Sequence, residues 1–165
     1  INIGSSKRWT SKRWGDRKFI ELINQLGSYN FRCVLTGTQD DKPQALKIFK
    51  SCLNKPIDLV GKTSITELIA LIKRCDLFIT SDSAPLHIAA AVKTPVIALF
   101  GPTDPRRHLP PGEEVYFIWK KQKCSPCYKP KCNRGNKCMD SITVEEVLNK
   151  VKQILGDKIE GTNSE

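Results

Sequence analysis

Short apolar runs alternate with helical patterns along most of this 165-residue chain. The runs have the length of strands rather than of buried helices, and no hairpin signal joins one run to the next. Such alternation favours an α/β fold, in which a parallel sheet carries helices on both faces. The predicted strands are Phe31–Leu35, Ile57–Val60, Leu77–Ile79, Val96–Phe100 and Val115–Trp119.

Helical patterns fill the segments between these runs. Ser64 and Glu67 have the spacing of a capping box, which predicts that a helix begins there. The polar residues 156–165 are expected to form a frayed tail. Further helices are expected at residues 16–27, 43–53 and 144–155.

The turns that follow the predicted strands carry the polar chemistry. In a parallel sheet the carboxyl ends of the strands share one edge, and ligands bind at that edge. In the clearest of these turns, Ser81, Asp82 and Ser83 precede a helix that has Pro85 near its first turn. Capping side chains, free amides and the positive end of a helix dipole would meet there, which favours an anion site. No turn matches a Walker loop or a G-x-G-x-x-G fingerprint.

The chain carries 27 basic and 17 acidic residues, a formal net charge of +10. This balance favours acidic partners, such as phosphates, nucleic acid or an anionic membrane surface. Seven of the basic residues fall between Lys120 and Lys137, where no acidic residue occurs. No apolar run reaches the roughly 18 residues that a membrane-spanning helix needs.

The same segment holds Cys124, Cys127, Cys132 and Cys138. Four thiolates in one short loop are enough for a tetrahedral structural zinc or for another thiolate-bound metal. Disulfide bonds and free thiols are the alternatives, because the spacing is tighter than in an ordinary zinc ribbon. The total of seven cysteines is odd, which fits poorly with a fully oxidised secreted framework.

Four motifs follow one another in a characteristic order and spacing. They are Lys12-Arg13-Trp14 followed by Phe19, Gly61-Lys62-Thr63-Ser64, Asp82-Ser83-Ala84-Pro85-Leu86-His87, and Phe100-Gly101-Pro102-Thr103-Asp104-Pro105. Together they resemble glycosyltransferase family nine, the bacterial heptosyltransferases. The resemblance implies a GT-B enzyme, which has two Rossmann-like domains with the active site between them. Residues 1–155 would be the C-terminal, donor-binding domain with a Cys-rich insertion at 120–140, and the N-terminal acceptor domain would be absent from this chain.

The resemblance also implies roles for individual residues. Asp82 corresponds to the family's aspartate in the donor-binding turn, and Lys12 to the lysine that reaches the donor phosphates. Lys7-Arg8-Trp9 duplicates the later motif, but Phe19 favours the second copy. Gln39 stands where an acidic residue often binds the ribose, a contact that Asp40 could take instead. The predicted donor site comprises Ser5, Ser6, Lys12, Gly37, Gln39, Thr63, Asp82, Ser83, Ala84, Pro85 and His87.

The implied reaction is inverting, metal-independent transfer from an ADP-heptose-type donor to a lipopolysaccharide core or lipid A acceptor. Amides, a lysine and hydroxyls can stabilise the charge that builds on the leaving phosphate, so no cofactor is required for catalysis. The base would come from the N-terminal domain, so no residue here is predicted to be catalytic and the chain alone is expected to transfer little sugar. The implied location is the cytoplasm, with basic patches in peripheral contact with the inner membrane.

Other interpretations stay open from the residues alone. A nucleic-acid-binding module, with the Cys segment as a zinc knuckle and the tryptophans as stacking surfaces, would explain the charge but not the turns. Nucleic acid is therefore the less favoured partner. Taken singly, Asp82 is also explained as a helix cap, His87 as a helix residue bonded to backbone, and Lys12 as a solvated cation.

Overall fold

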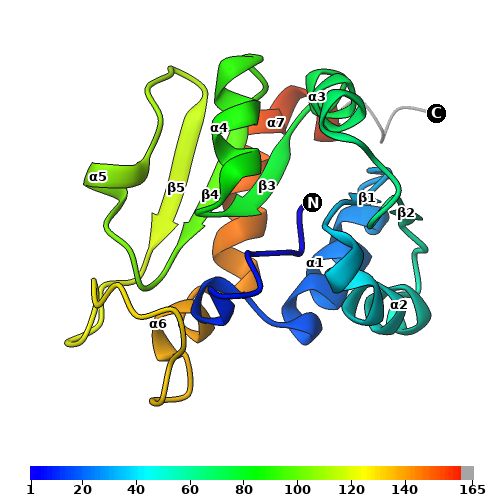
Figure 1. Ribbon diagram of the computed structural model, residues 1–165. Coiled ribbons are helices and arrows are strands. Elements are labelled where there is room, and N and C mark those ends of the chain that lie inside the picture. The colour runs from blue at the N-terminus through cyan, green and yellow to red at the C-terminus, as the bar shows by residue number, and fades with distance from the viewer. Residues whose placement is uncertain (161–165) are drawn as a thin grey trace.

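The computed structural model describes residues 1–160, with the side chains of residues 1–156 (Figure 1). Its helices are α1 Asp16–Ser28, α2 Lys42–Ser51, α3 Ile65–Lys73, α4 Ala84–Ala91, α5 Pro105–His108, α6 Lys137–Asp140 and α7 Val144–Glu160, with 3-10 turns at Thr10–Lys12 and Gln39–Asp41. Its strands are β1 Val34–Leu35, β2 Ile57–Asp58, β3 Phe78–Ser81, β4 Val96–Phe100 and β5 Val115–Trp119. No helix among these is long and apolar enough to cross a membrane.

The N-terminal segment, residues 1–3, joins two parallel sheets. One sheet pairs β1 with β2, and the other has the order β3-β4-β5. Asn2 forms a parallel bridge with Thr36 on one side, and its amide donates to the Ile79 carbonyl at 2.8 Å on the other. The combined order is therefore β2, β1, residues 1–3, β3, β4, β5. This is the order of the Rossmann fold, in which ligands bind where the order reverses, here between residues 1–3 and β3.

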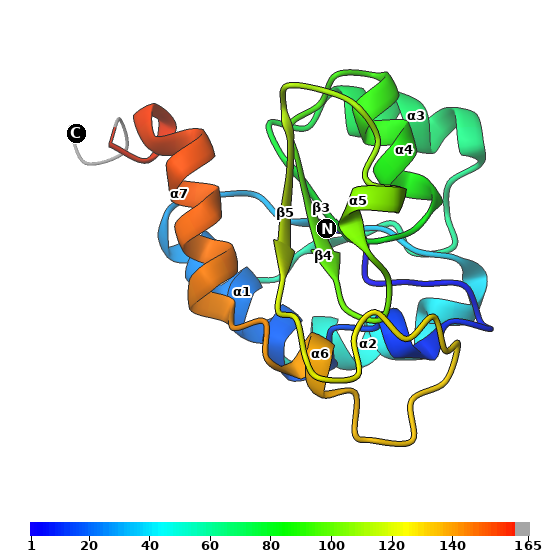
Figure 2. The same ribbon diagram turned by 90° about the vertical axis from the view of Figure 1, so that its left-hand side faces the viewer.

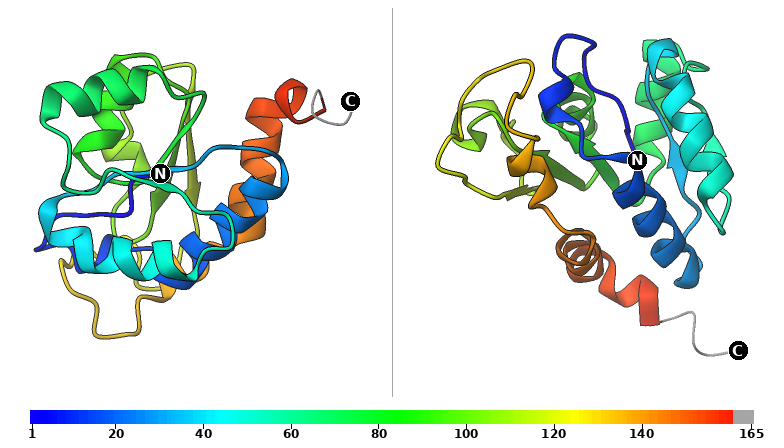
Figure 3. Two further views of the ribbon diagram at one scale, coloured as in Figure 1. Left: turned by 90° about the vertical axis from the view of Figure 1, so that its right-hand side faces the viewer. Right: turned by 90° about the horizontal axis from the view of Figure 1, so that it is seen from below.

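The two faces of the sheet bury separate apolar clusters, as the alternation of side chains along a strand requires. On β4, Ile97 and Leu99 join the cluster that packs against α1 and α7. Val96, Ala98 and Phe100 point the other way, into the cluster beneath α3 and α4. Figure 2 shows the sheet edge-on between these helices, and Figure 3 shows α1 beside α7. The predicted parallel sheet with helices on both faces is confirmed.

The expected strands differ in how well the structure matches them. Val96–Phe100 and Val115–Trp119 are strands over their full predicted length. The first two expected strands are shorter than predicted. The first starts late because the Phe31 amide still bonds to the end of α1, at the Leu26 carbonyl, and pairing with β2 begins near Cys33. The apolar runs mark where strands lie but not where pairing starts.

The helix boundaries are mostly as predicted, with one correction at the C-terminus. The Ser64–Glu67 capping box is present at the start of α3. Helix α7 continues to Glu160, past a non-helical Leu155, so the expected frayed tail is wrong for residues 156–160. Polarity alone does not end a helix, and residues 157–160 include no Gly or Pro to stop it. The rest of the expected tail, 161–165, lies outside the described residues.

Candidate functional site

A cavity of about 630 Å³ opens where the strand order reverses. This volume lies within the range of ligand pockets, about 300–1,000 Å³. Its walls come from the turns after residues 1–3, β1, β2 and β3, which meet at the carboxyl edge of the sheet. It is lined by Asn2, Gly4, Ser5, Ser6, Trp9, Lys12, Gly37, Thr38, Gln39, Asp41, Gly61, Thr63, Ser64, Ile65, Leu68, Asp82, Ser83, Ala84 and Pro85.

The cavity brings together the residues predicted for the donor site, with the exception of His87. His87 is exposed on α4 and does not line the cavity. Asp40, the suggested alternative ribose contact, also lies outside it, and its carboxylate pairs with Lys7 at 2.9 Å. Of the two candidates for the ribose contact, Gln39 therefore lines the cavity and Asp40 does not.

Lys12 is held against the cavity wall by Asp82. Its Nζ donates to Asp82 Oδ2 at 2.7 Å and to the Asp82 carbonyl at 3.0 Å. The two side chains are only 15% and 7% exposed. Thr103 donates its hydroxyl to the same Oδ2 at 2.7 Å, and the Lys12 ammonium lies 4.6 Å from the ring centroid of Trp9. The ammonium is thus fixed at the wall rather than free in solvent.

The start of α4 differs from the prediction in one respect. Ser83 is the N-cap residue, but no side chain caps the helix. The Ser83 hydroxyl donates instead to the Ser81 carbonyl at 3.2 Å, and Asp82 is bound by Lys12. The predicted capping role of Ser81, Asp82 and Ser83 is therefore wrong. A helix start without a side-chain cap, with Pro85 in its first turn, leaves backbone donors for an anion.

A buried aspartate that the sequence analysis missed organises the opposite wall. Asp41 is 1% exposed, and its Oδ2 accepts from the amide and hydroxyl of Thr38 at 2.9 and 2.8 Å. Arg13 donates to its Oδ1 at 2.9 Å. A Cβ on Gly4 would lie 2.3 Å from Oδ2, so only glycine fits there. The capping-box spacing of Thr38 and Asp41 was the available signal.

The apolar part of the wall was also missed. Trp9 lines the cavity, whereas Trp14 is 1% exposed and packs edge-on against Phe19 with centroids 5.2 Å apart. The site therefore takes its lysine from the second Lys-Arg-Trp copy and its tryptophan from the first. Ile65, which is 72% exposed, and Leu68 add an apolar surface from α3. Such a surface suits the face of a nucleobase.

The four clustered cysteines line a second cavity of about 540 Å³. All are free thiols, so the disulfide alternative is not seen. Burial raises the pKa of Cys138, and the Arg134 amide donates to Cys132 Sγ at 3.4 Å. Within residues 1–160, no three His, Cys, Asp or Glu side chains are placed so that they could hold a metal ion. The four thiols, as they are placed, do not form the predicted zinc site.

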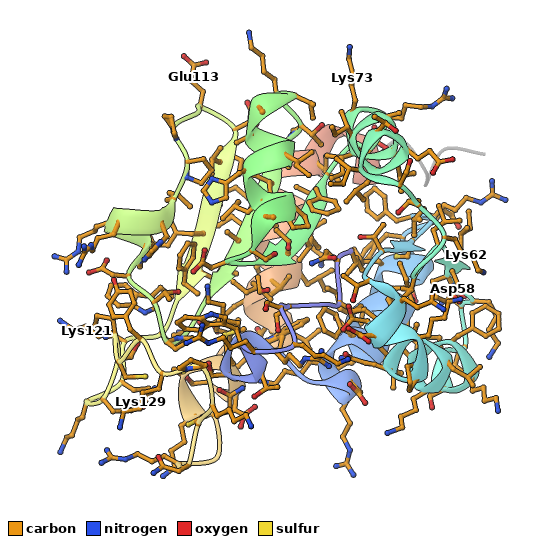
Figure 4. All side chains as sticks on the ribbon, in the orientation of Figure 1. Asp58, Lys62, Lys73, Glu113, Lys121 and Lys129 are labelled. Carbon is orange, nitrogen blue, oxygen red and sulfur yellow. The ribbon has the colours of Figure 1, made fainter. Side chains whose placement is uncertain are left out.

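The Cys-rich loop packs beside the first cavity. Ser11, next to Lys12, donates its hydroxyl to the Lys129 carbonyl at 2.6 Å and its amide to the Pro130 carbonyl at 3.1 Å. The side chains of Lys121 and Lys129 point away from the body of the domain at the lower left of Figure 4. The basic loop is therefore attached to the segment that carries the cavity's lysine.

Comparisons with known proteins agree with this architecture. Lipopolysaccharide heptosyltransferase 3 of Escherichia coli K12 is 38% identical over 158 residues, which are 94% of this chain and 46% of that protein. The structure of the family 9 glycosyltransferase from Veillonella parvula has a TM-score of 0.83 at 24% identity, over 95% of this chain and 46% of that one. The chain spans about half the length of the relatives it matches.

Two further solved structures contain a nucleotide or a metal. E. coli heptosyltransferase WaaC with ADP has a TM-score of 0.71 at 20% identity, over 93% of this chain and 43% of that one. The iron-containing dodecameric glycosyltransferase TibC of enterotoxigenic E. coli also has a TM-score of 0.71, at 16% identity, over 95% of this chain and 44% of TibC. At these identities the likeness shows the fold, which is that of half of a GT-B heptosyltransferase.

The model of glycosyltransferase family 9 (heptosyltransferase) matches residues 1–138. That match includes the four motifs and the four clustered cysteines. None of these comparisons points to a nucleic-acid-binding module. The chain belongs to glycosyltransferase family 9, the heptosyltransferase family.

Proposed function

We propose that this domain binds the nucleotide-sugar donor, of the ADP-heptose type, for inverting, metal-independent transfer to a lipopolysaccharide core or lipid A acceptor. One observation carries the proposal: a ligand-sized cavity at the topological switch point gathers Lys12, the start of α4, Ser5 and Thr63. The ADP complex of a heptosyltransferase with the same fold supports the choice of nucleotide.

The groups around the cavity match the parts of such a donor. The diphosphate would lie between the uncapped start of α4 and the Lys12 ammonium, where backbone donors and a cation converge. The nucleoside would lie toward Gln39 and the apolar side chains Ile65 and Leu68. When the glycosidic bond to the diphosphate breaks, negative charge builds on the leaving phosphate, and these fixed donors stabilise it.

The base that deprotonates the acceptor would come from an N-terminal domain of the same protein, together with most of the acceptor site. Transfer would take place in the cytoplasm at the inner membrane, where an anionic acceptor is presented. The outward-pointing Lys121 and Lys129 of the Cys-rich loop would lie against the anionic bilayer. Vesicles with and without anionic lipid test this contact: equal binding to both would count against it.

Titration of the isolated chain with ADP, UDP and GDP tests the donor assignment. ADP is expected to bind most tightly, and a chain that binds none of the three would refute the proposal. The isolated chain is expected to turn over little or no ADP-heptose, because the base would come from the N-terminal domain. Measurable transfer by the chain alone would remove the requirement for an N-terminal domain.

A thiolate-bound structural metal at Cys124, Cys127, Cys132 and Cys138 is a separate proposal. It is supported by the shared cavity of the four thiols and by the iron-containing TibC, which has the same fold; zinc is not favoured over iron. The thiols would have to move closer together to bind it. About one metal per chain, in protein prepared without chelator, would support a tetrathiolate site. Absence of both metals would end the proposal.

A further inference from the structure

Thr103 lies behind the wall of the donor cavity rather than in it. It is 1% exposed and does not line the cavity, yet its hydroxyl donates to Asp82 Oδ2 at 2.7 Å. The same carboxylate oxygen accepts from Lys12 Nζ at 2.7 Å. Building on the proposed function, we propose that Thr103 is a positioning residue for the donor lysine, because its hydroxyl orients the carboxylate that holds the ammonium.

The hydroxyl is presented by a fixed turn after β4. The amides of Cys127 and Tyr128 donate to the Pro102 carbonyl at 3.0 and 2.9 Å, and the Ser125 hydroxyl donates to the Gly101 carbonyl. These bonds attach the turn to the Cys-rich loop through Gly101 and Pro102, the two residues before Thr103. The position of the hydroxyl is therefore set by bonds in which the Lys12 side chain takes no part.

Without that hydroxyl, Lys12 would be the remaining side-chain partner of the Asp82 carboxylate. The terminal torsion of an aspartate is broad, so the Asp82 carboxylate needs a second partner to fix its plane. Lysine carries its charge on a flexible stem of four carbons. With Thr103 in place, Oδ2 receives both donors, and the Lys12 ammonium is held at the cavity wall beside Asp82.

Loss of this orientation is expected to affect the turnover number more than donor affinity. In the ground state the diphosphate would also be bound by the start of α4, so donor affinity depends less on Lys12. Stabilisation of the charge that develops on bond cleavage requires an ammonium that is already in place. Direct removal of such a donor costs about 10²–10³ in kcat. Misplacing the lysine should cost less, so T103V is expected to lower kcat about tenfold and to change the donor KM less than about threefold.

The experiment uses the full-length protein with ADP-heptose and a lipopolysaccharide-core acceptor. T94V is the matched control, because Thr94 is 4% exposed and its hydroxyl donates to the Ile72 carbonyl at 2.9 Å, away from the cavity. T94V should lower the melting temperature about as much as T103V but leave kcat unchanged. T103S, which keeps the hydroxyl, should restore most of the activity. T103C, whose thiol is a weak donor, replaces T103V if that variant does not fold.

A double-mutant cycle shows whether Thr103 acts through Lys12. In the K12A background, T103V should lower kcat by less than about twofold, because no ammonium is left to orient. Additive effects, or a T103V variant as active as T94V, would overturn the inference. If the wild-type protein transfers no heptose at all, the proposed function has failed. An active wild type with an unaffected T103V refutes only the role of Thr103.

Discussion

The duplicated Lys-Arg-Trp sequence offers a direct test of the donor lysine, because its two copies place their lysines differently. Lys12 lines the cavity and is 15% exposed, whereas Lys7 lies outside it, is 78% exposed and pairs with Asp40 at 2.9 Å. K12A and K7A each remove one positive charge from the same segment. Any long-range attraction of phosphate by the net charge of +10 therefore changes alike in both variants.

The expected magnitudes follow from these environments. A hydrogen bond to a charged group contributes about 1.5–3 kcal/mol, so K12A should weaken ADP binding about tenfold to a hundredfold. K12A also leaves the Asp82 carboxylate, 7% exposed, with Thr103 as its remaining side-chain partner. That should cost about 1–3 kcal/mol of stability. K7A breaks an exposed pair, worth about 0–1 kcal/mol, and should leave ADP affinity unchanged.

Calorimetric titration with ADP at a temperature well below both unfolding transitions measures affinity on folded protein, and thermal unfolding measures stability separately. Equal losses of ADP affinity in K12A and K7A would show that the lysines act only through overall charge. An unchanged affinity in K12A would refute the assignment of Lys12 to the phosphates.

Four further results are expected. G4A should destabilise the domain by more than about 1 kcal/mol in urea unfolding, because its Cβ would meet the buried Asp41 carboxylate at 2.3 Å; a wild-type midpoint would contradict this packing. S64A should cost about 1 kcal/mol through loss of the α3 capping box, and a loss below about 0.3 kcal/mol would show that the box contributes little. Cys132 is exposed, whereas burial raises the pKa of Cys138, so iodoacetamide at neutral pH should label Cys132 first in peptide mass spectra; the reverse order would show that Cys138 is accessible as thiolate. Burial favours the protonated thiol of Cys138 in the folded state, whereas the unfolded chain can deprotonate it at the ordinary thiol pKa. The contribution of Cys138 to stability should therefore fall as pH rises above that value.

Local signals in the sequence were enough to predict the elements at the centre of the fold. The run Val96–Phe100 is a strand as predicted, and Pro85 marks the first turn of α4. These features depend on residues close together in the chain, which is where propensity and spacing are informative. Because the carboxyl ends of parallel strands share one edge, the polar turns could be predicted to lie together without knowledge of the contacts.

Contacts between distant segments could not be predicted in the same way. Lys12 and Asp82 are 70 positions apart, so nothing local shows that the aspartate binds the lysine instead of capping α4. The resemblance brought His87 into the predicted site as a member of a motif, but the turn of α4 leaves it exposed outside the cavity. Spacing favours the second Lys-Arg-Trp copy, but the cavity takes its tryptophan, Trp9, from the first.

A nucleoside diphosphate that binds between residues 1–6 and the start of α4 should change the surroundings of the backbone amides there. Amide chemical shifts of the labelled chain, followed during titration with ADP, measure this change residue by residue. Saturable shifts are expected at Ser83 and Ala84 and at the cavity residues Ser5 and Ser6, with little change around the second cavity at Cys132. Shifts confined to the basic Cys-rich loop, with none at Ser83 and Ala84, would contradict this placement of the nucleotide.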